Sequence, residues 1–329
     1  MLLRELARCR ACHLREEAGK LALHHTRAGM HLPFHVLDVF TATRYQGNPL
    51  AVVLDAGAVD AARMQAIAKE FNLSETVFVM PPDRAGHAAR LRIFTPGREI
   101  PFAGHPTVGA AVLLAELRGD RVQPGSAEAL LVLEEEIGPV RVGVRLRGGD
   151  APFAEFDAPR LPTETGPVAP NEDLAAALTL RVGEIGFENH RPTRYSAGNA
   201  FAFVPISSLE VIGKAQISPQ HWGALQGEGA FLYCRQCVHT SSAFHARMFA
   251  PGFGVAEDPA TGSAAAALAA VIHRFDAPTD GIHKRIIEQG YEMGRASEIA
   301  LSLTVAAGRL ANARIGGHAV RVMQGALEA

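Results

Sequence analysis

Two short polar segments stand immediately before stretches of small residues, and their side chains are of types that bind anions and transfer protons. One segment, Glu257–Ala267, reads EDPATGSAAAA, and the other, Gly104–Ala111, reads GHPTVGAA. An aspartate such as Asp258 caps a helix by accepting a backbone N–H, and Pro259 suits the first helical position. A helix N-terminus also carries unpaired N–H groups and partial positive charge, which attract anions. The segment therefore predicts a capped structural helix, an anion-binding pocket, or both.

The two polar segments belong to a faint internal repeat. Three segments recur in the same order, TRYQGN as TRYSAGN, RIFTPG as RMFAPG, and HPTVGAA as DPATGSA. The separations, measured at Asn48 and Asn199, Arg92 and Arg247, and His105 and Asp258, are 151, 155 and 153 residues. Collinear repeats of this kind indicate two similarly folded halves. If a pseudo-twofold axis relates the halves, His105 and Asp258 lie at equivalent positions on the two walls of a cleft, where two helix N-termini hold a carboxylate.

Hydrophobic periodicity predicts the elements that position these segments. In the first half it predicts a helix over 61–71 and strands at 34–40, 49–55, 75–80 and 88–94. The helices predicted over 106–117 and 259–273 lack a continuous charged face, which is typical of buried helices. We therefore predict an α+β protein with two pseudo-symmetric domains, each a bent β-sheet or barrel wrapped around a central buried helix.

The same patterns divide the chain into parts. Residues 1–29 show no strand pattern and are expected to form an N-terminal extension outside the core. The first half is expected to cover 30–148 and the second 149–305. The β-rich stretches at 129–147 and 299–324 complete the sheets, and residues 306–329 are expected to return to the first half.

Length, charge and hydropathy exclude several classes of protein. The chain has 329 residues and a net charge of −2, which favours neither nucleic acid nor an anionic membrane as a partner. No apolar run reaches the length of about 18 residues that a transmembrane helix needs. The N-terminal segment mixes arginine and glutamate with leucine and lacks the apolar core of a signal peptide. We expect a cytoplasmic protein.

The four cysteines form two C-x-x-C pairs, Cys9/Cys12 and Cys234/Cys237. The first pair precedes His13, which matches the haem-attachment pattern, and the two pairs together supply enough thiolates for a zinc ion. A c-type haem requires export, however, and a zinc ribbon separates its pairs by about 15–20 residues. More than 200 residues intervene here. Ordinary intracellular thiols are the expected state.

Sequence motifs for cofactors are absent. The chain contains no G-x-G-x-x-G, P-loop, G-x-S-x-G or H-E-x-x-H pattern. Dinucleotide, nucleotide, serine-hydrolase and zincin functions therefore lose their main support. We expect neither a cofactor nor a metal ion.

Longer segments carry a resemblance to a known family. They are DVFTATRYQGNPLAVVLDA, IAKEFNLSETVFV, RIFTPGREIPFAGHPTVGAAVL, EDPATGSAAAAL and IEQGYEMGRAS. Together they resemble the phenazine-biosynthesis PhzF-like family, which is built on the diaminopimelate epimerase fold, and they extend from about residue 34 to 324. The resemblance implies a cofactor-independent isomerase, because the best known member isomerises trans-2,3-dihydro-3-hydroxyanthranilate by moving a ring proton. It also implies a small anionic carboxylate as substrate and a homodimer.

The resemblance assigns roles to individual residues. It implies that Glu75, within NLSET, is the general acid/base, with His105 and Asp258 as further catalytic residues. His105, Asp258 and Ser263 match polar residues of the family's substrate pocket, and Gly104 and Gly262 match backbone positions close to the substrate.

Each of these side chains also has a purely structural interpretation. A glutamate at the start of a strand is usually solvated, and it serves as a general acid/base only where burial raises its pKa toward neutrality. His105 titrates near neutral pH, Asp258 suits a helix cap, and Ser263 within a helix can bond back to a carbonyl.

Two alternative functions stay open. An amino-acid epimerase or racemase of the same fold places a cysteine in each half as paired bases, but none of the four cysteines lies in the polar segments. A protein that binds a small anion without turnover would keep the same pocket.

Overall fold

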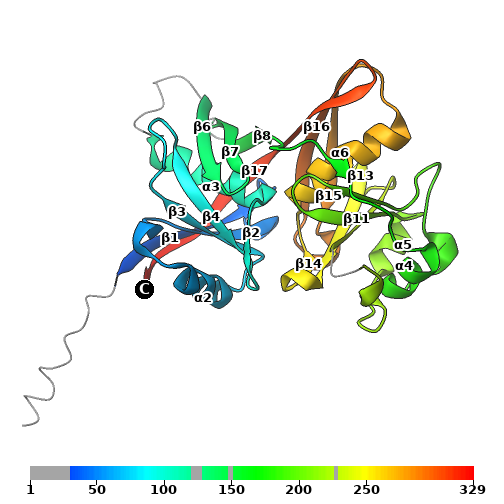
Figure 1. Cartoon of the computed structure of the whole chain (residues 1–329), viewed down its shortest axis with the longest axis horizontal. Helices are drawn as coiled ribbons and strands as arrows, with labels where there is room; N and C mark the ends of the chain where they lie inside the picture. Colours follow the sequence, from blue (N-terminus) through cyan, green and yellow to red (C-terminus); the bar gives the residue numbers. More distant parts are fainter. Residues whose placement is uncertain (1–29, 120–127, 147–150, 226–228) are drawn as a thin grey trace, which may run out of the picture.

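The fold is seen in a computed structural model that describes residues 30–119, 128–146, 151–225 and 229–329. Two halves, each a mixture of helices and strands, lie beside one another (Figure 1), which confirms the predicted α+β class. No helix among the described residues is long and apolar enough to span a membrane. Residues 1–29, expected to form an extension and containing Cys9 and Cys12, lie outside the described part of the chain.

The strands of the first half close into a barrel. They are β1 (His31–Val39), β2 (Asn48–Val53), β3 (Glu75–Met80), β4 (Ala89–Phe94), β5 (Glu99–Ile100), β6 (Glu128–Glu135), β7 (Gly138–Arg145), β8 (Phe153–Asp157) and β17 (Arg309–Glu328). The barrel order is β17, β1, β2, β3, β4, β6, β7 and β8, and β8 pairs with β17 again. Two of these pairs, β2 with β3 and β4 with β6, are parallel, and the others are antiparallel.

The second half follows a similar order. Its strands are β9 (Thr163–Glu164), β10 (Thr193–Ser196), β11 (Ala200–Pro205), β12 (Gly229–Cys234), β13 (Phe244–Ala250), β14 (Val255–Asp258), β15 (Gly281–Gln289) and β16 (Ser297–Ala306). Its parallel pairs are β11 with β12 and β13 with β15, at the places where the first half has β2 with β3 and β4 with β6. This shared order is the structural counterpart of the sequence repeat.

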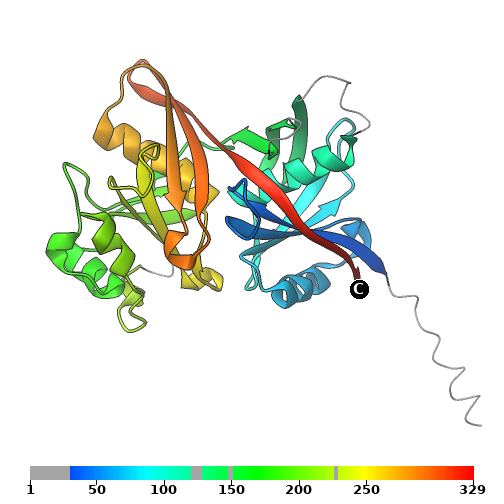
Figure 2. The same ribbon diagram turned by 180° about the vertical axis from the view of Figure 1, so that it is seen from behind.

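Strand β17 connects the two halves. Residues 309–316 pair with β16 of the second half, and residues 319–328 pair with β1 of the first half. Figure 2 shows this strand, drawn in red, running across the back of the molecule from one half to the other. Strand β8 pairs with β7 and β17, so the first barrel extends beyond the division at 148 and 149 that the sequence suggested.

A helix lies inside each sheet, α3 (Gly104–Leu117) in the first half and α6 (Gly262–Asp276) in the second. Every residue of α3 from 104 to 115 is buried, as is every residue of α6 from 262 to 272. Alanine and glycine predominate in the buried part of α6, whereas α3 combines them with valine and leucine, and strands pack against both helices from all sides.

The remaining helices lie outside the sheets. They are α2 (Ala61–Phe71), α4 (Asn171–Leu178) and α5 (Leu209–Lys214), with short 3-10 helices η1 (Ala56–Ala58), η3 (Val182–Glu184), η4 (Trp222–Leu225), η5 (Pro251–Phe253) and η6 (Tyr291–Met293). Helix α2 has the predicted bounds. Asp60 caps its start by accepting the N–H of Arg63, and Asn72 ends it with a left-handed φ of 51°. This turn leads the chain directly into β3 and Glu75.

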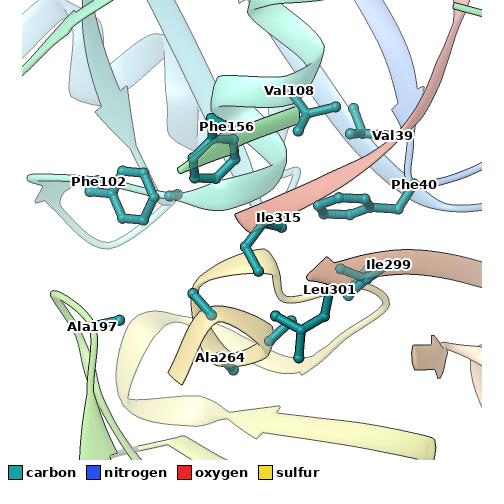
Figure 3. Close-up of a cluster of buried hydrophobic side chains, with 14 of the residues drawn as sticks. Val39, Phe40, Phe102, Val108, Phe156, Ala197, Ala264, Ile299, Leu301 and Ile315 are labelled. Atoms are coloured by element: carbon teal, nitrogen blue, oxygen red, sulfur yellow. The ribbon is translucent and has the colours of Figure 1, made fainter. Parts of the chain in front are cut away.

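One hydrophobic core runs through both halves. In Figure 3, Phe102 and Phe156 of the first half lie above Ala264 and Leu301 of the second, with Ile315 of β17 between them. The two phenylalanine rings pack edge to face with centroids 5.7 Å apart. Because this apolar surface is buried jointly, its removal from water holds the two halves together.

The second central helix begins later than predicted. Helix α6 starts at Gly262 with Thr261 as its N-cap, so Asp258 is not the helix cap and Pro259 is not the first helical residue. Asp258 instead ends β14, and its carboxylate accepts hydrogen bonds from Asn48 and Thr261. Because those side chains occupy the carboxylate, it is not directed at the helix N–H groups.

The N-termini of the two central helices touch. A Cβ atom placed on Gly104 would lie 2.7 Å from Cα of Gly262, and one placed on Gly262 would lie 3.0 Å from Cα of Gly104. Only glycine permits such an approach between two backbones. The next residues along the helices are His105 and Ser263, so these two occupy equivalent positions in the halves, rather than His105 and Asp258 as expected.

We expect Gly104→Ala to destabilise the fold, because the new methyl group would meet backbone atoms that cannot rotate away. Overpacking of this kind costs about 1–3 kcal/mol in the free energy of unfolding, which urea denaturation measures. Gly183→Ala is the control, since its methyl group would meet nothing within 4 Å. Equal stability of Gly104→Ala and the wild type would contradict the close helix contact.

Candidate active site

The residues implied by the resemblance come together where the two halves meet. Glu75 begins β3, His105 is the second residue of α3, Asp258 ends β14, and Ser263 is the second residue of α6. Ser263 therefore lies in the first helical turn and not in the helix interior. Gly104 and Gly262 form the contact beneath these side chains.

Glu75, Asp258 and Ser263 line a cavity between the halves. Apolar side chains from both halves, including Ile100, Phe201 and Met248, form much of its remaining wall. The cavity encloses about 50 Å³, which is room for a few water molecules at most.

Glu75, which lines the cavity, lies beside the buried side chain of His105. Their closest atoms, Oε2 of Glu75 and Nε2 of His105, are 3.3 Å apart, and their side chains are only 14% and 3% exposed. Neither atom has a hydrogen-bond partner of good geometry within the described residues. A proton can pass between two such groups after a small reorientation.

Asp258 is held by a network of polar side chains. Its Oδ1 accepts a hydrogen bond of 2.8 Å from Nδ2 of Asn48, and its Oδ2 accepts one of 2.5 Å from Oγ1 of Thr261. Gln289 braces the backbone here, donating to the carbonyl of Asp258 at 2.7 Å and accepting the N–H of Thr261 at 3.1 Å. The carboxylate is therefore fixed in place and well supplied with donors.

Burial gives the two carboxyl groups unusual acidities. It raises the pKa of Glu75 well above 4.5, and the nearby charge of Asp258 raises it further. Burial also raises the pKa of Asp258, but hydrogen bonds from Thr261, Ser74 and Asn48 oppose this effect. The net pKa of Asp258 is also raised, but less strongly than that of Glu75, because donors stabilise its anion and so favour the negative charge on Asp258.

The imidazole of His105 is neutral at ordinary pH. Burial lowers its pKa to about 3, because the charged form would lose its hydration. His105 therefore contributes one N–H donor and one nitrogen acceptor to the site rather than a positive charge.

The two helix N-termini offer donors to an anion. Neither Ala103, the N-cap of α3, nor Thr261, the N-cap of α6, caps its helix with a side chain. The N–H groups of the first turns and the helix dipoles therefore remain available for a negatively charged ligand.

A hairpin from each half lies at the cavity wall. Arg92 of β4 pairs through two hydrogen bonds with Glu99, at 2.7 and 2.6 Å, and Arg247 of β13 pairs in the same way with Glu257, at 2.8 and 2.9 Å. The first residue of the recurring segments RIFTPG and RMFAPG thus makes the same kind of ion pair in each half. Residues at both hairpin turns, Thr95 and Phe253, line the cavity.

Several polar residues of the site were not assigned from the sequence. They are Asn48, Ser74, Thr261 and Gln289, all bonded to Asp258 or to its backbone. The signal for Asn48 was present in the repeat, but spacing along the chain does not reveal which polar groups converge in space.

Cys234 and Cys237, the cysteines within the described residues, lie outside the candidate site. Cys234 is buried and Cys237 partly buried, both are free, and burial raises their pKa values to about 12 and about 11. They are therefore protonated, and neither lines the cavity. Across the described ranges, no cluster of three or more His, Cys, Asp or Glu side chains is arranged to hold a metal ion.

Comparison with known proteins places this chain in a family. The model of the phenazine biosynthesis-like proteins, PhzC-PhzF, matches residues 37–325. The chain belongs to this family. The family assignment and the catalytic class predicted from the resemblance are confirmed, because similar PhzF-family proteins are named isomerases, and the chain is an isomerase.

Three relatives of this PhzF-family chain illustrate the similarity. It is 55% identical over 297 residues to an uncharacterized isomerase of Mesorhizobium japonicum, covering 88% of this chain and 96% of the relative. It is 34% identical over 291 residues to trans-2,3-dihydro-3-hydroxyanthranilate isomerase of Pseudomonas aeruginosa, with coverages of 88% and 97%. The crystal structure of a PhzF-family protein of Bacillus anthracis superposes with a TM-score of 0.80 at 25% identity, covering 91% and 99% of the chains.

We expect Glu75→Gln to be more stable than the wild type at neutral pH. When a carboxyl group has a raised pKa in the folded state, the protein loses stability as pH rises, because this group ionises at a lower pH in the unfolded chain. The free energy of unfolding of the variant should exceed that of the wild type by about 1.4 kcal/mol for each unit by which the pKa of Glu75 is raised. This difference should vanish below pH 4.5, the ordinary value.

Urea unfolding at neutral pH and below pH 4.5 measures this difference. Glu70→Gln, at an exposed position of α2, is the matched control and should show no such gain. A stability difference for Glu75→Gln that does not change with pH would contradict the raised pKa.

Proposed function

We propose that this chain is a cofactor-independent isomerase that moves a proton between carbon atoms of a small carboxylate, with Glu75 as the general acid/base. The observation that carries the proposal is the position of the Glu75 carboxyl group. It lies in a small cavity, 3.3 Å from a buried, neutral histidine, and beside the charge of Asp258. A carboxyl group with a raised pKa is a stronger base when ionised and holds a proton well enough to return it.

The substrate carboxylate binds at the helix N-termini. The backbone around Gly104 and Gly262 supplies N–H donors, and Ser263 adds a hydroxyl group at the cavity wall. This placement uses the dipoles of α3 and α6 together, so that both halves are needed to complete the site. The apolar part of the cavity then encloses the remainder of the ligand.

The reaction consists of two proton transfers. Glu75, after losing its resting proton to solvent, acts as a carboxylate and removes a proton from a carbon acidified by the unsaturated system next to it, which breaks a C–H bond and forms an O–H bond. The proton on Glu75 exchanges with solvent while it is held on oxygen, Glu75 then delivers a proton to a different carbon, and it is a carboxylate again. His105 stabilises the negative charge that develops on the substrate between these steps by donating a hydrogen bond, and Asp258 positions the substrate by accepting hydrogen bonds from its donor groups. Nothing is oxidised or reduced.

One substrate is the natural first choice. The 34% identical relative from Pseudomonas aeruginosa is named trans-2,3-dihydro-3-hydroxyanthranilate isomerase, which supports that cyclic amino acid as the compound to test. An epimerase would instead return the proton to the carbon from which it came, on the opposite face. The helix starts that would carry its two bases hold Gly104 and His105 in one half and Gly262 and Ser263 in the other, with no thiol.

We expect the wild type to incorporate deuterium into trans-2,3-dihydro-3-hydroxyanthranilate during turnover in D₂O, at a carbon other than the one that loses its hydrogen. Glu75→Gln should lower kcat by about 10²–10⁴-fold, the contribution typical of a general acid/base. Absorbance and NMR of the product measure both effects.

Glu70→Gln, an exposed change on α2, should keep the wild-type rate. Full turnover by Glu75→Gln would contradict the assigned base. Turnover of another carboxylate, but not of this compound, would contradict only the choice of substrate. Deuterium found at the carbon that lost its hydrogen, with inversion, would contradict the isomerase in favour of the epimerase.

A further inference from the structure

The side chain of Asn48 contacts two of the three candidate catalytic residues. Asn48 is the first residue of β2 and is fully buried. Its Nδ2 lies 2.8 Å from Oδ1 of Asp258, 2.9 Å from the carbonyl oxygen of Ala260 and 3.2 Å from Nδ1 of His105. Asn48 and His105 belong to the first half, whereas Asp258 and Ala260 belong to the second, so this amide group bridges the halves.

The orientation of the Asn48 amide group follows from its neighbours. A carboxylate oxygen and a carbonyl oxygen accept hydrogen bonds and cannot donate them. Turning the amide over would place its oxygen against both of them in a buried site, which is costly. The NH₂ group must therefore face Asp258 and Ala260, and it also lies against Nδ1 of His105, so its two hydrogens are shared among three neighbours while Oδ1 of Asn48 has no partner among the described residues.

The orientation of this amide also determines where His105 carries its proton. A neutral imidazole has one protonated nitrogen and one acceptor nitrogen. An Nδ1–H would point at the NH₂ group of Asn48, donor against donor, so Nδ1 is the acceptor and Nε2 carries the proton. Nε2 is the atom that lies 3.3 Å from Oε2 of Glu75. The protonated nitrogen of His105 is thus the one nearest the proposed acid/base, although the two atoms make no hydrogen bond of good geometry.

We propose that Asn48 is a positioning residue that holds His105 in the Nε2-protonated tautomer and keeps the negative charge of the site on Asp258. The role in catalysis rests on the proposed function of Glu75, but the tautomer does not. The hydrogen bond from Asn48 opposes the rise in the pKa of Asp258 that burial causes. Because the amide group of Asn48 contacts both halves, it can fix the tautomer of His105 and the charge of Asp258 only when the two halves are packed together.

The backbone at Asn48 is fixed from several sides, as a positioning role requires. Asn48 pairs with Val39 of β1, and Gly47 before it has a φ of +67°, where a Cβ atom would lie 2.4 Å from the carbonyl oxygen of Val39. Arg295 of the second half donates to the carbonyls of Gln46 and Gly47, at 2.8 and 2.9 Å. The same arginine pairs with Asp38 at 2.6 Å.

The repeat supplies a natural comparison. Asn199 precedes β11 as Asn48 begins β2, but Asn199 is only partly buried, and its amide donates to the carbonyl of Phe102 at 3.4 Å. The equivalent of His105 in the second half is Ser263, which has no tautomers. The positioning role therefore belongs to one copy of the repeated asparagine.

The test is the tautomer of His105, observed by NMR of protein labelled with ¹⁵N-histidine at neutral pH. Loss of one ring signal set in His105→Gln identifies the residue. We expect an unprotonated Nδ1 and a protonated Nε2 in the wild type, and a shift of Nδ1 toward the protonated range in Asn48→Ala. Asn199→Ala should keep the wild-type tautomer. With trans-2,3-dihydro-3-hydroxyanthranilate, Asn48→Ala should lower kcat about ten- to hundredfold and change KM less than about threefold.

A protonated Nδ1 in the wild type would overturn the proposal without any variant. An unchanged tautomer in folded Asn48→Ala would overturn it as well, even if kcat fell, and so would a changed tautomer with an unchanged kcat. The NMR result needs no substrate. An active Glu75→Gln would therefore remove the proposed function while leaving the tautomer of His105 to be judged by itself.

Discussion

The whole arrangement depends on the contact between Gly104 and Gly262. It brings two buried helices end to end, so their N–H groups and dipoles converge on one small volume. That convergence requires glycine at both contact positions and a sheet bent tightly around each helix. It also requires the halves to share one core, in which β17 and residues from both halves pack together. The site is thus a property of the interface between halves.

Placing polar groups at this interface has an electrostatic consequence. Two carboxyl groups, Glu75 and Asp258, are held close together with little water, and they cannot both ionise cheaply. The donors are distributed unequally, since Asp258 receives several hydrogen bonds whereas Oε2 of Glu75 has no partner among the described residues. The proton therefore resides on Glu75, beside a neutral His105. A site of this kind stores a proton and has a strong base once the proton leaves, which suits proton transfer at carbon.

Much of the fold was predictable because periodicity and repetition are local in the sequence. Apolar spacing predicts the bounds of α2 and β3 and the two helices that are buried on all sides. The sequence repeat predicts that the two halves share one order of elements. The predicted start of α6 was wrong. Asp-Pro is a good helix start in isolation, but the side chain of Asp258 accepts a hydrogen bond from Asn48 of the other half. Asn48 and Gln289 were missed for the same reason: their partners lie far away in sequence.

The central claim is that the carboxyl group of Glu75 is protonated in the docked halves while Asp258 is charged. The most direct measurement is a titration of the Glu75 side-chain carboxyl by ¹³C NMR, with Glu75→Gln to identify its signal. The expected midpoint lies well above 4.5 and falls in Asp258→Asn, because the neighbouring negative charge is gone. A midpoint near 4.5 in the wild type, unchanged by Asp258→Asn, would contradict the account.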